Sequence, residues 1–226
     1  MRPDTHDDAA RQLADAYRFS LPEARLQLQQ RRLTQYFSGR HAVLDIGCGR
    51  GVFLDLLRER GIGGEGVDVM PDAVARCRAK GHPAEVGEAV EFLTDKFERY
   101  DGILCSHVIE HLEFEPATRL LARCFRALAA GGRLVIVTPN PRDLSIIGEV
   151  FWLDPTHRRP YPAVLIESML ASTGFVAIES SAPLGRPARR REWPGWLVRK
   201  IALGSYFGNP ESIVVASKPD GAPPAD

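Results

Sequence analysis

Short apolar runs alternate with helical patterns along most of this chain, and no other feature limits its fold as strongly. Runs with the length and composition of strands occupy residues 42–47, 64–69, 83–87, 100–106, 133–139, 175–180 and 212–218. Helical patterns occupy residues 52–61, 71–81, 116–132 and 163–174. Because neighbouring parallel strands need a long crossover connection, this order predicts a parallel sheet with helices on both faces.

The last two predicted strands break the alternation, because a basic and aromatic segment at 185–208 lies between them. We therefore expect the final strand to insert antiparallel. The predicted fold class is α/β, a doubly wound, seven-stranded, mostly parallel sheet with an antiparallel last strand. Residues 39–218 would form this domain, with an amino-terminal helical segment at 1–38. The tail at 219–226, PDGAPPAD, is expected to be disordered.

Charge and composition exclude some classes of partner. The 29 Lys and Arg residues balance 29 Asp and Glu residues, so no overall field indicates nucleic acid. The amino terminus lacks the apolar core of a leader peptide, and no apolar run reaches about 18 residues, so we expect a cytoplasmic protein. The cysteines show no CxxC spacing, which favours buried free thiols over disulfides or zinc: Cys48, Cys77, Cys105 and Cys124.

A glycine-rich turn, VLDIGCGRG (43–51), joins the first predicted strand to the first predicted helix. Its glycines, Gly47, Gly49 and Gly51, would let the backbone approach a ligand at the helix amino terminus. The spacing is GxGxG rather than GxGxxG, and Asp45 precedes it. A carboxylate here suits a cationic aminoacyl sulfonium better than a pyrophosphate, and Asp68 suits a ribose diol. The alternative is a purely structural turn of an open α/β protein.

The chain here resembles the class I S-adenosylmethionine-dependent methyltransferases. VLDIGCGRG looks like their first motif, GVDVMP (66–71) like the acidic second-strand motif, and GEAVEFL (87–93) like the adenine-side segment. YDGILCSHVIEHL (100–112) and LAAGGRLVIVTPNP (128–141) look like the fourth- and fifth-strand motifs. The resemblance implies S-adenosylmethionine as the cofactor and transfer of its methyl group as the reaction.

By this resemblance, Asp45 and the glycine turn would contact the methionine part, and Asp68 the ribose. Val69, Glu88 and Ala89 would contact the adenine, and Ser106 would lie beside the sulfonium. The order of motifs is also similar to bacterial methyltransferases encoded among surface-glycan genes, including relatives of O-antigen chain-terminating enzymes. That likeness implies a helical lid from the amino-terminal segment. The cofactor-binding residues so implied are Tyr17, Arg31, Asp45, Gly47, Cys48, Gly49, Gly51, Asp68, Val69, Glu88, Ala89 and Ser106.

The loop FWLDPTHRRPYP (151–162) combines an acid, a histidine and two arginines among three prolines. It follows the fifth strand, so it lies at the carboxyl end of the sheet, where open α/β sheets bind ligands. We expect His157 to act as a general base, with Asp154 orienting it or sharing the role. The alternative is a proline-stiffened turn. The predicted acceptor-binding residues are His107, Asn140, Arg158, Arg159 and Tyr161.

A second constellation in SHVIEHL raises the question of a metal. His107, Glu110 and His111 lie within five residues, with His157 as a distant fourth group. His107 and His111 would share one face of a helix, as metal ligands often do. Glu110-His111 also occurs as a polar pair at helix starts in metal-free relatives, so we predict no metal and keep a divalent ion as the alternative.

The leading prediction is O-methylation of a sugar, a nucleotide sugar or a glycan-linked phosphate. The alternatives are a small-molecule or quinone-type O-methyltransferase with an apolar pocket, with or without assistance from a metal, and a cofactor-binding protein without transfer activity. The segment 185–208 mixes six basic residues with two tryptophans. We expect its apolar residues to pack in a hairpin or a subunit contact such as a homodimer. A peripheral contact with a membrane or lipid carrier is the alternative.

Overall fold

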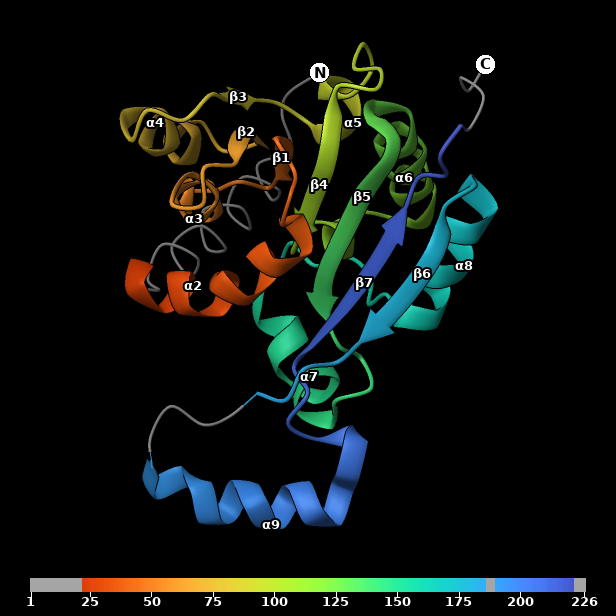
Figure 1. The fold of residues 1–226 in the computed structure, drawn as a ribbon. Coiled ribbons are helices and arrows are strands. Elements are labelled where there is room, and N and C mark those ends of the chain that lie inside the picture. Colours follow the sequence, from red (N-terminus) through yellow and green to blue (C-terminus); the bar gives the residue numbers. More distant parts are fainter. Residues whose placement is uncertain (1–21, 186–189, 222–226) are drawn as a thin grey trace, which may run out of the picture.

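The computed structural model describes residues 22–185 and 190–221, which form a seven-stranded sheet covered by helices (Figure 1). The strand order is β3-β2-β1-β4-β5-β7-β6. Only β7 runs antiparallel, pairing with β5 on one side and β6 on the other, as the sequence predicts. The strands are β1 Ala42–Ile46, β2 Gly63–Asp68, β3 Ala84–Val86, β4 Tyr100–Ser106, β5 Leu128–Pro139, β6 Val176–Ser181 and β7 Glu211–Ser217.

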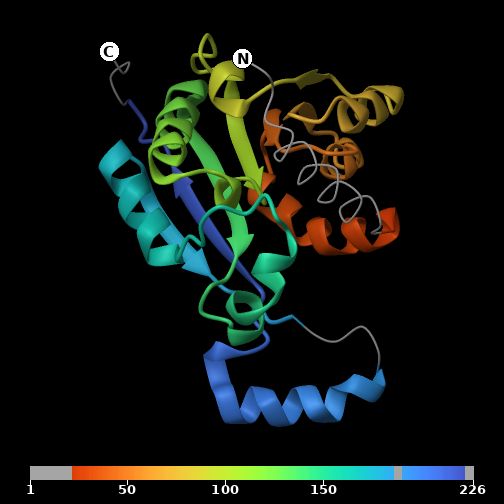
Figure 2. The same ribbon diagram turned by 180° about the vertical axis from the view of Figure 1, so that it is seen from behind.

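Helices cover both faces of the sheet, and two hydrophobic cores lie between the layers (Figures 1 and 2). The α-helices are α2 Glu23–Gln30, α3 Val52–Arg58, α4 Pro71–Ala79, α5 Ala89–Phe92, α6 Phe114–Ala127, α7 Leu144–Gly148, α8 Ala163–Thr173 and α9 Trp193–Leu203. The 3₁₀ helices are η1 Arg31–Phe37, η2 Ile109–His111, η3 Val150–Leu153, η4 Arg190–Glu192 and η5 Gly204–Tyr206. In β1, Val43 points into one core and Leu44 into the other, because successive strand residues face opposite sides.

Two predicted boundaries differ from the structure. The helix predicted for 116–132 ends at Ala127, and β5 begins at Leu128, which pairs with Tyr100. Gly131 has φ +68° and its N–H bonds the carbonyl of Lys218, so the glycines join this strand instead of ending a helix. In the amino-terminal segment, residues 23–37 are helical as expected, and the predicted part before residue 22 lies outside the described residues.

The described residues of the segment 185–208, which are 185 and 190–208, contain η4, α9 and η5 instead of the expected hairpin. No residue of α9 is buried, so the prediction of a packed hairpin is wrong, whereas the subunit contact predicted as the other form of packing stays a prediction. Figure 1 shows α9 projecting below α7, at the end where the β5 arrow points. Among the described residues, no helix is long and apolar enough to cross a bilayer.

Candidate functional site

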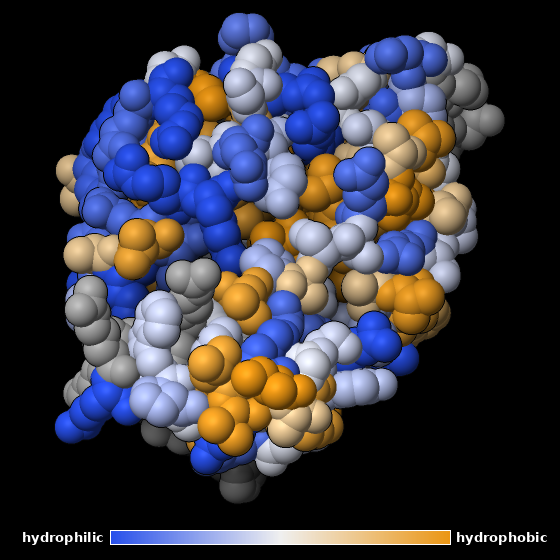
Figure 3. All heavy atoms as spheres, turned by 60° about the horizontal axis from the view of Figure 1, so that its bottom comes forward, coloured by the Kyte–Doolittle hydropathy of each residue, from blue (hydrophilic) through white to orange (hydrophobic). Residues whose placement is uncertain are grey.

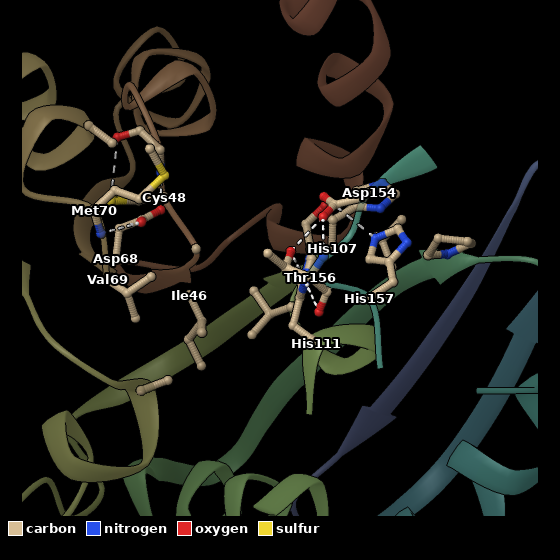
Figure 4. A pocket seen from close by; sticks show the side chains of 18 of the residues that line it. Ile46, Cys48, Asp68, Val69, Met70, His107, His111, Asp154, Thr156 and His157 are labelled. Atoms are coloured by element: carbon tan, nitrogen blue, oxygen red, sulfur yellow. Dashed lines mark hydrogen bonds and ion pairs between the residues drawn. The ribbon is translucent and has the colours of Figure 1, made fainter. Parts of the chain in front are cut away.

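One continuous cavity of about 1340 Å³ lies at the carboxyl ends of the central parallel strands. Its two ends differ in construction (Figure 4). We call the end near residues 47–51 (the glycine loop) the cofactor end. We call the end near residues 151–162 (the histidine loop) the acceptor end. Helix α2 contributes Arg25, Leu26 and Gln29 to the lining, so the described part of the amino-terminal segment borders the cavity.

The glycine loop leaves no room for a side chain at its first residue, where β1 turns towards α3. Gly47 has φ +75°, and a Cβ there would lie 2.6 Å from Cγ2 of Val108. Asp68 holds the loop: its Oδ2 accepts from the N–H of Gly49 at 2.8 Å and its Oδ1 from that of Met70 at 2.9 Å. The backbone of this loop is therefore fixed close to the cavity by one carboxylate.

Most predicted cofactor residues line the cavity: Gly47, Cys48, Gly49, Asp68, Val69, Glu88, Ala89 and Ser106. Asp45 and Gly51 lie behind this lining. Asp45 is only 3% exposed, and burial raises the pKa of its carboxyl well above the usual value, with smaller contributions from Cys77 and Asp68. A Cβ on Gly51 would lie 2.8 Å from Sγ of Cys77, so this glycine lets α4 pack against the loop.

The structure places Arg32, rather than Arg31, in the cavity lining. Arg31 points towards Glu59, with Nη2 3.4 Å from Oε2, while Arg32 forms an ion pair with Glu211 at the start of β7. The sequence signal QQRR contains both, and only the helical register of η1 separates them. Tyr17 lies outside the described residues. Glu211 carried no sequence signal, because it is the first residue of an otherwise ordinary buried strand.

His107 joins the two halves of the cavity as a cation. Its Nδ1 lies 3.1 Å from Oε1 of Glu110 and its Nε2 3.2 Å from Oε1 of Glu211. Enclosure by protein alone would lower the pKa of His107, but these two carboxylates outweigh that effect and raise it to about 10. Hydrogen bonds and charge from His107 likewise outweigh burial and lower the pKa of both carboxyls.

At the acceptor end, the histidine loop is fixed by its own acid. Oδ1 of Asp154 accepts from the backbone N–H of Thr156 at 2.9 Å and from its hydroxyl at 2.5 Å. Nδ1 of His157 lies 2.6 Å from the carbonyl of Phe151, which only accepts, so Nδ1 carries the proton. In the neutral ring Nε2 then holds the lone pair, 3.9 Å from Oδ2 of Asp154.

A second imidazole lies beside the first, since the rings of His111 and His157 are 4.7 Å apart. Nδ1 of His111 lies 3.2 Å from the carbonyl of Thr156, so His111 is also held by the histidine loop. One ligand atom each from Glu110, His111 and His157 lies within 4.8 Å of the others, and these three could hold a metal ion. The predicted alternative set contained His107, which the structure pairs with carboxylates instead.

Of the remaining predicted acceptor residues, one lines the cavity and three make contacts that support its walls. Arg158 lines the cavity. Arg159 lies over the rings of Phe114 and Tyr161, at 5.4 Å from each. Tyr161 is wholly buried and its hydroxyl donates to the carbonyl of Leu112 at 2.9 Å, while Nδ2 of Asn140 donates to the carbonyl of Asn209 at 2.8 Å. These last three residues hold the walls of the site together.

Apolar side chains dominate the rest of the acceptor end. They come from the residues on either side of η2, from the end of β5, from α7 and η3, from the histidine loop and from the residue before β7. The group consists of Val108, Leu112, Pro139, Ile146, Val150, Phe151, Pro155 and Pro210. The Phe151 ring lies 4.6 Å from that of His157, so an aromatic wall adjoins the imidazole pair. Such a lining favours an acceptor with a flat apolar body.

Comparison with known proteins identifies the kind of site. The sequence profile of a family described as a methyltransferase domain matches residues 8–207. The chain is similar to a Pseudomonas aeruginosa protein named ubiquinone biosynthesis O-methyltransferase, with 33% identity over 108 residues, 43% of this chain and 44% of that protein. The chain therefore spans less than half the length of this curated relative.

Solved structures share the fold over most of the chain. An S-adenosylmethionine-dependent methyltransferase from Archaeoglobus fulgidus has a TM-score of 0.78 and 28% identity, covering 89% of this chain and 96% of that one. A phosphoethanolamine N-methyltransferase from Haemonchus contortus, in complex with S-adenosylmethionine, has a TM-score of 0.62 and 19% identity over 85% of this chain and 53% of its own. At that identity the second likeness concerns the fold alone.

Proposed function

The chain belongs to the methyltransferase-domain family, and from this premise we propose that it methylates a hydroxyl oxygen of a small aromatic acceptor. Transfer from S-adenosylmethionine to some acceptor is the activity of the family and of the structural neighbours. The observation that carries the choice of oxygen is the His157 imidazole, which presents Nε2 in a cavity shared with the glycine loop. A hydroxyl becomes an effective nucleophile when such a base takes its proton, whereas a neutral amine attacks through its own lone pair.

The residues of the cofactor end fit S-adenosylmethionine. A loop in which Gly47 has no space for a Cβ allows backbone contact with the methionine part. Asp68 sits at the end of β2, and Val69, Glu88 and Ala89 line the adjoining wall, where ribose and adenine would bind. When bound, the cofactor supplies an electrophilic methyl group on a sulfonium.

The histidine loop would then receive the proton of the acceptor hydroxyl. As the oxygen–carbon bond forms and the sulfonium–methyl bond breaks, which would leave the spent cofactor as a neutral thioether, the hydroxyl proton would move to Nε2 of His157, while Nδ1–H stays on the carbonyl of Phe151. Asp154, 3.9 Å from Nε2, would stabilise the resulting imidazolium. The apolar wall, including Phe151, would hold an aromatic ring and keep water from the reacting oxygen.

An aromatic hydroxyl is favoured over the sugar predicted from the motif order. The apolar lining is the feature that a small-molecule or quinone-type pocket should have, and the P. aeruginosa relative carries an O-methyltransferase name in ubiquinone biosynthesis. One feature supports the glycan reading as the second candidate. Arg158 lines the cavity and suits a phosphate or carboxylate on the acceptor.

The test is transfer of labelled methyl from S-adenosylmethionine to a panel of phenols, nucleotide sugars and carrier-linked glycans. We expect the phenols to be labelled and His157→Ala to lower kcat roughly 10²–10⁴-fold. His41→Ala, at an exposed histidine outside the cavity, is the matched control and should act like the parent. Labelling of sugars alone would overturn the aromatic acceptor.

Treatment with a chelator distinguishes the two possible roles of His157, general base and metal ligand. With His157 as the base, EDTA should leave turnover unchanged. Loss of activity that magnesium or another divalent ion restores would instead assign Glu110, His111 and His157 as ligands.

A further inference from the structure

Among the described residues, helix α9 contacts the segment that follows it through Trp196 and Lys200. The indole of Trp196 lies against Gly208, whose Cβ position is 3.1 Å from Cζ2. Nζ of Lys200 donates to the carbonyl of Phe207 at 2.7 Å and to Oδ1 of Asn209 at 2.6 Å. These contacts join α9 to the segment that leads into β7 and fix which face of the helix turns away from the protein.

The opposite face of α9 is apolar and exposed. Leu197, Val198 and Ile201 are 53%, 66% and 77% exposed, and their three- and four-residue spacing places them on one side of the helix. Trp193, at the first turn, is 43% exposed. In Figure 3 the lower end of the molecule carries a cluster of hydrophobic side chains. An exposed apolar patch of this kind marks a binding surface.

The charge around α9 indicates the partner. Although the whole chain has a formal net charge of zero, the segment 185–208 contains six basic residues and one acidic residue. Arg191 and Arg199 are exposed in the described part of this segment. A two-fold contact between copies of the chain through α9 would bring two positively charged segments together. An anionic surface is complementary to them.

The same end of the protein carries further exposed apolar side chains from α7 and η3. Leu144, Val150, Trp152 and Leu153 are between 43% and 61% exposed, and Val150 also lines the cavity. Figure 1 shows α7 directly above α9. The apolar surface is thus continued towards the acceptor end of the cavity, and tryptophans occur in both parts, as they do at membrane interfaces.

We propose that α9 binds the surface of a lipid bilayer with anionic headgroups. The helix would lie in the plane of the interface, with Leu197, Val198 and Ile201 in the acyl boundary and the basic side chains among the headgroups. The binding is reversible and peripheral, since one short amphipathic helix carries it. It does not depend on the identity of the acceptor, so the proposed reaction stands or falls separately.

The test is co-sedimentation of the full chain with vesicles of phosphatidylcholine containing phosphatidylglycerol, and with vesicles of phosphatidylcholine alone. We expect binding to the anionic vesicles, much weaker binding to the neutral ones, and release by salt. Leu197→Glu and Ile201→Glu should each lower the partition constant about tenfold or more, because each takes a large apolar side chain out of the interface.

The matched control is Val176→Glu, at an equally apolar residue that is 47% exposed on β6. It should bind like the parent, and all three variants should keep the parent's melting temperature because the residues are exposed. Equal binding by the parent and both α9 variants would overturn the proposal. So would absence of vesicle binding together with a dimer in the ultracentrifuge that Ile201→Glu dissociates, because α9 would then be a contact between copies.

Discussion

The two ends of the cavity are built in different ways. At the cofactor end, one continuous stretch of chain forms the end of β1, the glycine loop and the start of α3, and the contacts are between backbone N–H groups and Asp68. At the acceptor end, side chains meet from η1, η2, the histidine loop and β7. A site formed by the backbone of one continuous segment is rigid and can be predicted from a local sequence motif. A site formed by side chains from distant segments depends on how the whole sheet packs, and no single motif predicts it.

The largest effect at the cofactor end is expected when a side chain is added at a glycine that has no space for one. Gly47→Ala would combine a left-handed backbone with a Cβ 2.6 Å from Val108. We expect S-adenosylmethionine affinity in calorimetry to fall about 100-fold. Gly39→Ala is the matched control, because Gly39 has nearly the same φ, +74°, with nothing within 4 Å of its Cβ position. If both variants bind like the parent, the loop is not the cofactor cradle.

The next largest loss of cofactor affinity is expected when the carboxylate that holds the loop is removed. Asp68→Ala removes two hydrogen bonds to backbone N–H groups and the expected ribose contact. A loss of about 1.5–3 kcal/mol is expected for hydrogen bonds of a charged group, or roughly 10–100-fold in affinity. Asp68→Asn keeps one acceptor oxygen and should fall between. Unchanged affinity in Asp68→Ala would remove this residue from the cofactor site.

The acceptor end contains a natural pair of matched residues. Arg158 lines the cavity, whereas Arg159 lies over Phe114 and Tyr161. With an acceptor that bears a phosphate or carboxylate, Arg158→Ala should raise KM about tenfold and Arg159→Ala should change it much less. With an uncharged phenol, neither should move KM by more than about twofold. The reverse order for the charged acceptor would show that the loop turns its other arginine inwards.

The smallest expected effect concerns the His107 cation between the two ends. Its pKa is raised to about 10, so the stability it confers is fully present below about pH 6.5 and is lost as the pH rises through 10. The pKa values of Glu110 and Glu211 are lowered, so their share is lost as the pH falls below about 4.5. The melting temperature of His107→Gln should therefore lie furthest below that of the parent near pH 5–6.5, and the difference should shrink towards pH 10. A difference that grows with pH would contradict the ion cluster.

The comparison also explains what the sequence could predict. The sheet, the antiparallel β7 and the glycine loop follow from local patterns, and the structure confirms the predicted fold class. Three residues predicted for the acceptor, Asn140, Arg159 and Tyr161, lie instead in supporting contacts, because hydrogen-bonding residues near a loop serve its walls as readily as its cavity. Nothing local distinguishes Arg32 from Arg31, since only helical register turns one inwards.

The exposed face of α9 is a second feature that local sequence patterns could not predict. The composition of 185–208 is compatible with both a packed and a surface-bound segment, and the sequence alone favoured packing in a hairpin or a subunit contact. Which face of α9 is exposed depends on two contacts across the turn after the helix. Trp196 packs against Gly208, and Lys200 donates a hydrogen bond to Asn209. Contacts across a short irregular turn leave no periodic signal in the sequence.

The central claim is that His157 removes a proton from an acceptor hydroxyl. The most direct measurement is the ratio of kcat for the parent to that for His157→Ala, across substituted forms of the labelled phenol that differ in acidity. The ratio should be roughly 10²–10⁴ for weakly acidic phenols and fall towards one for phenols already ionised at the assay pH, since these need no base. A ratio near one throughout, or a large ratio independent of acidity, would contradict the account.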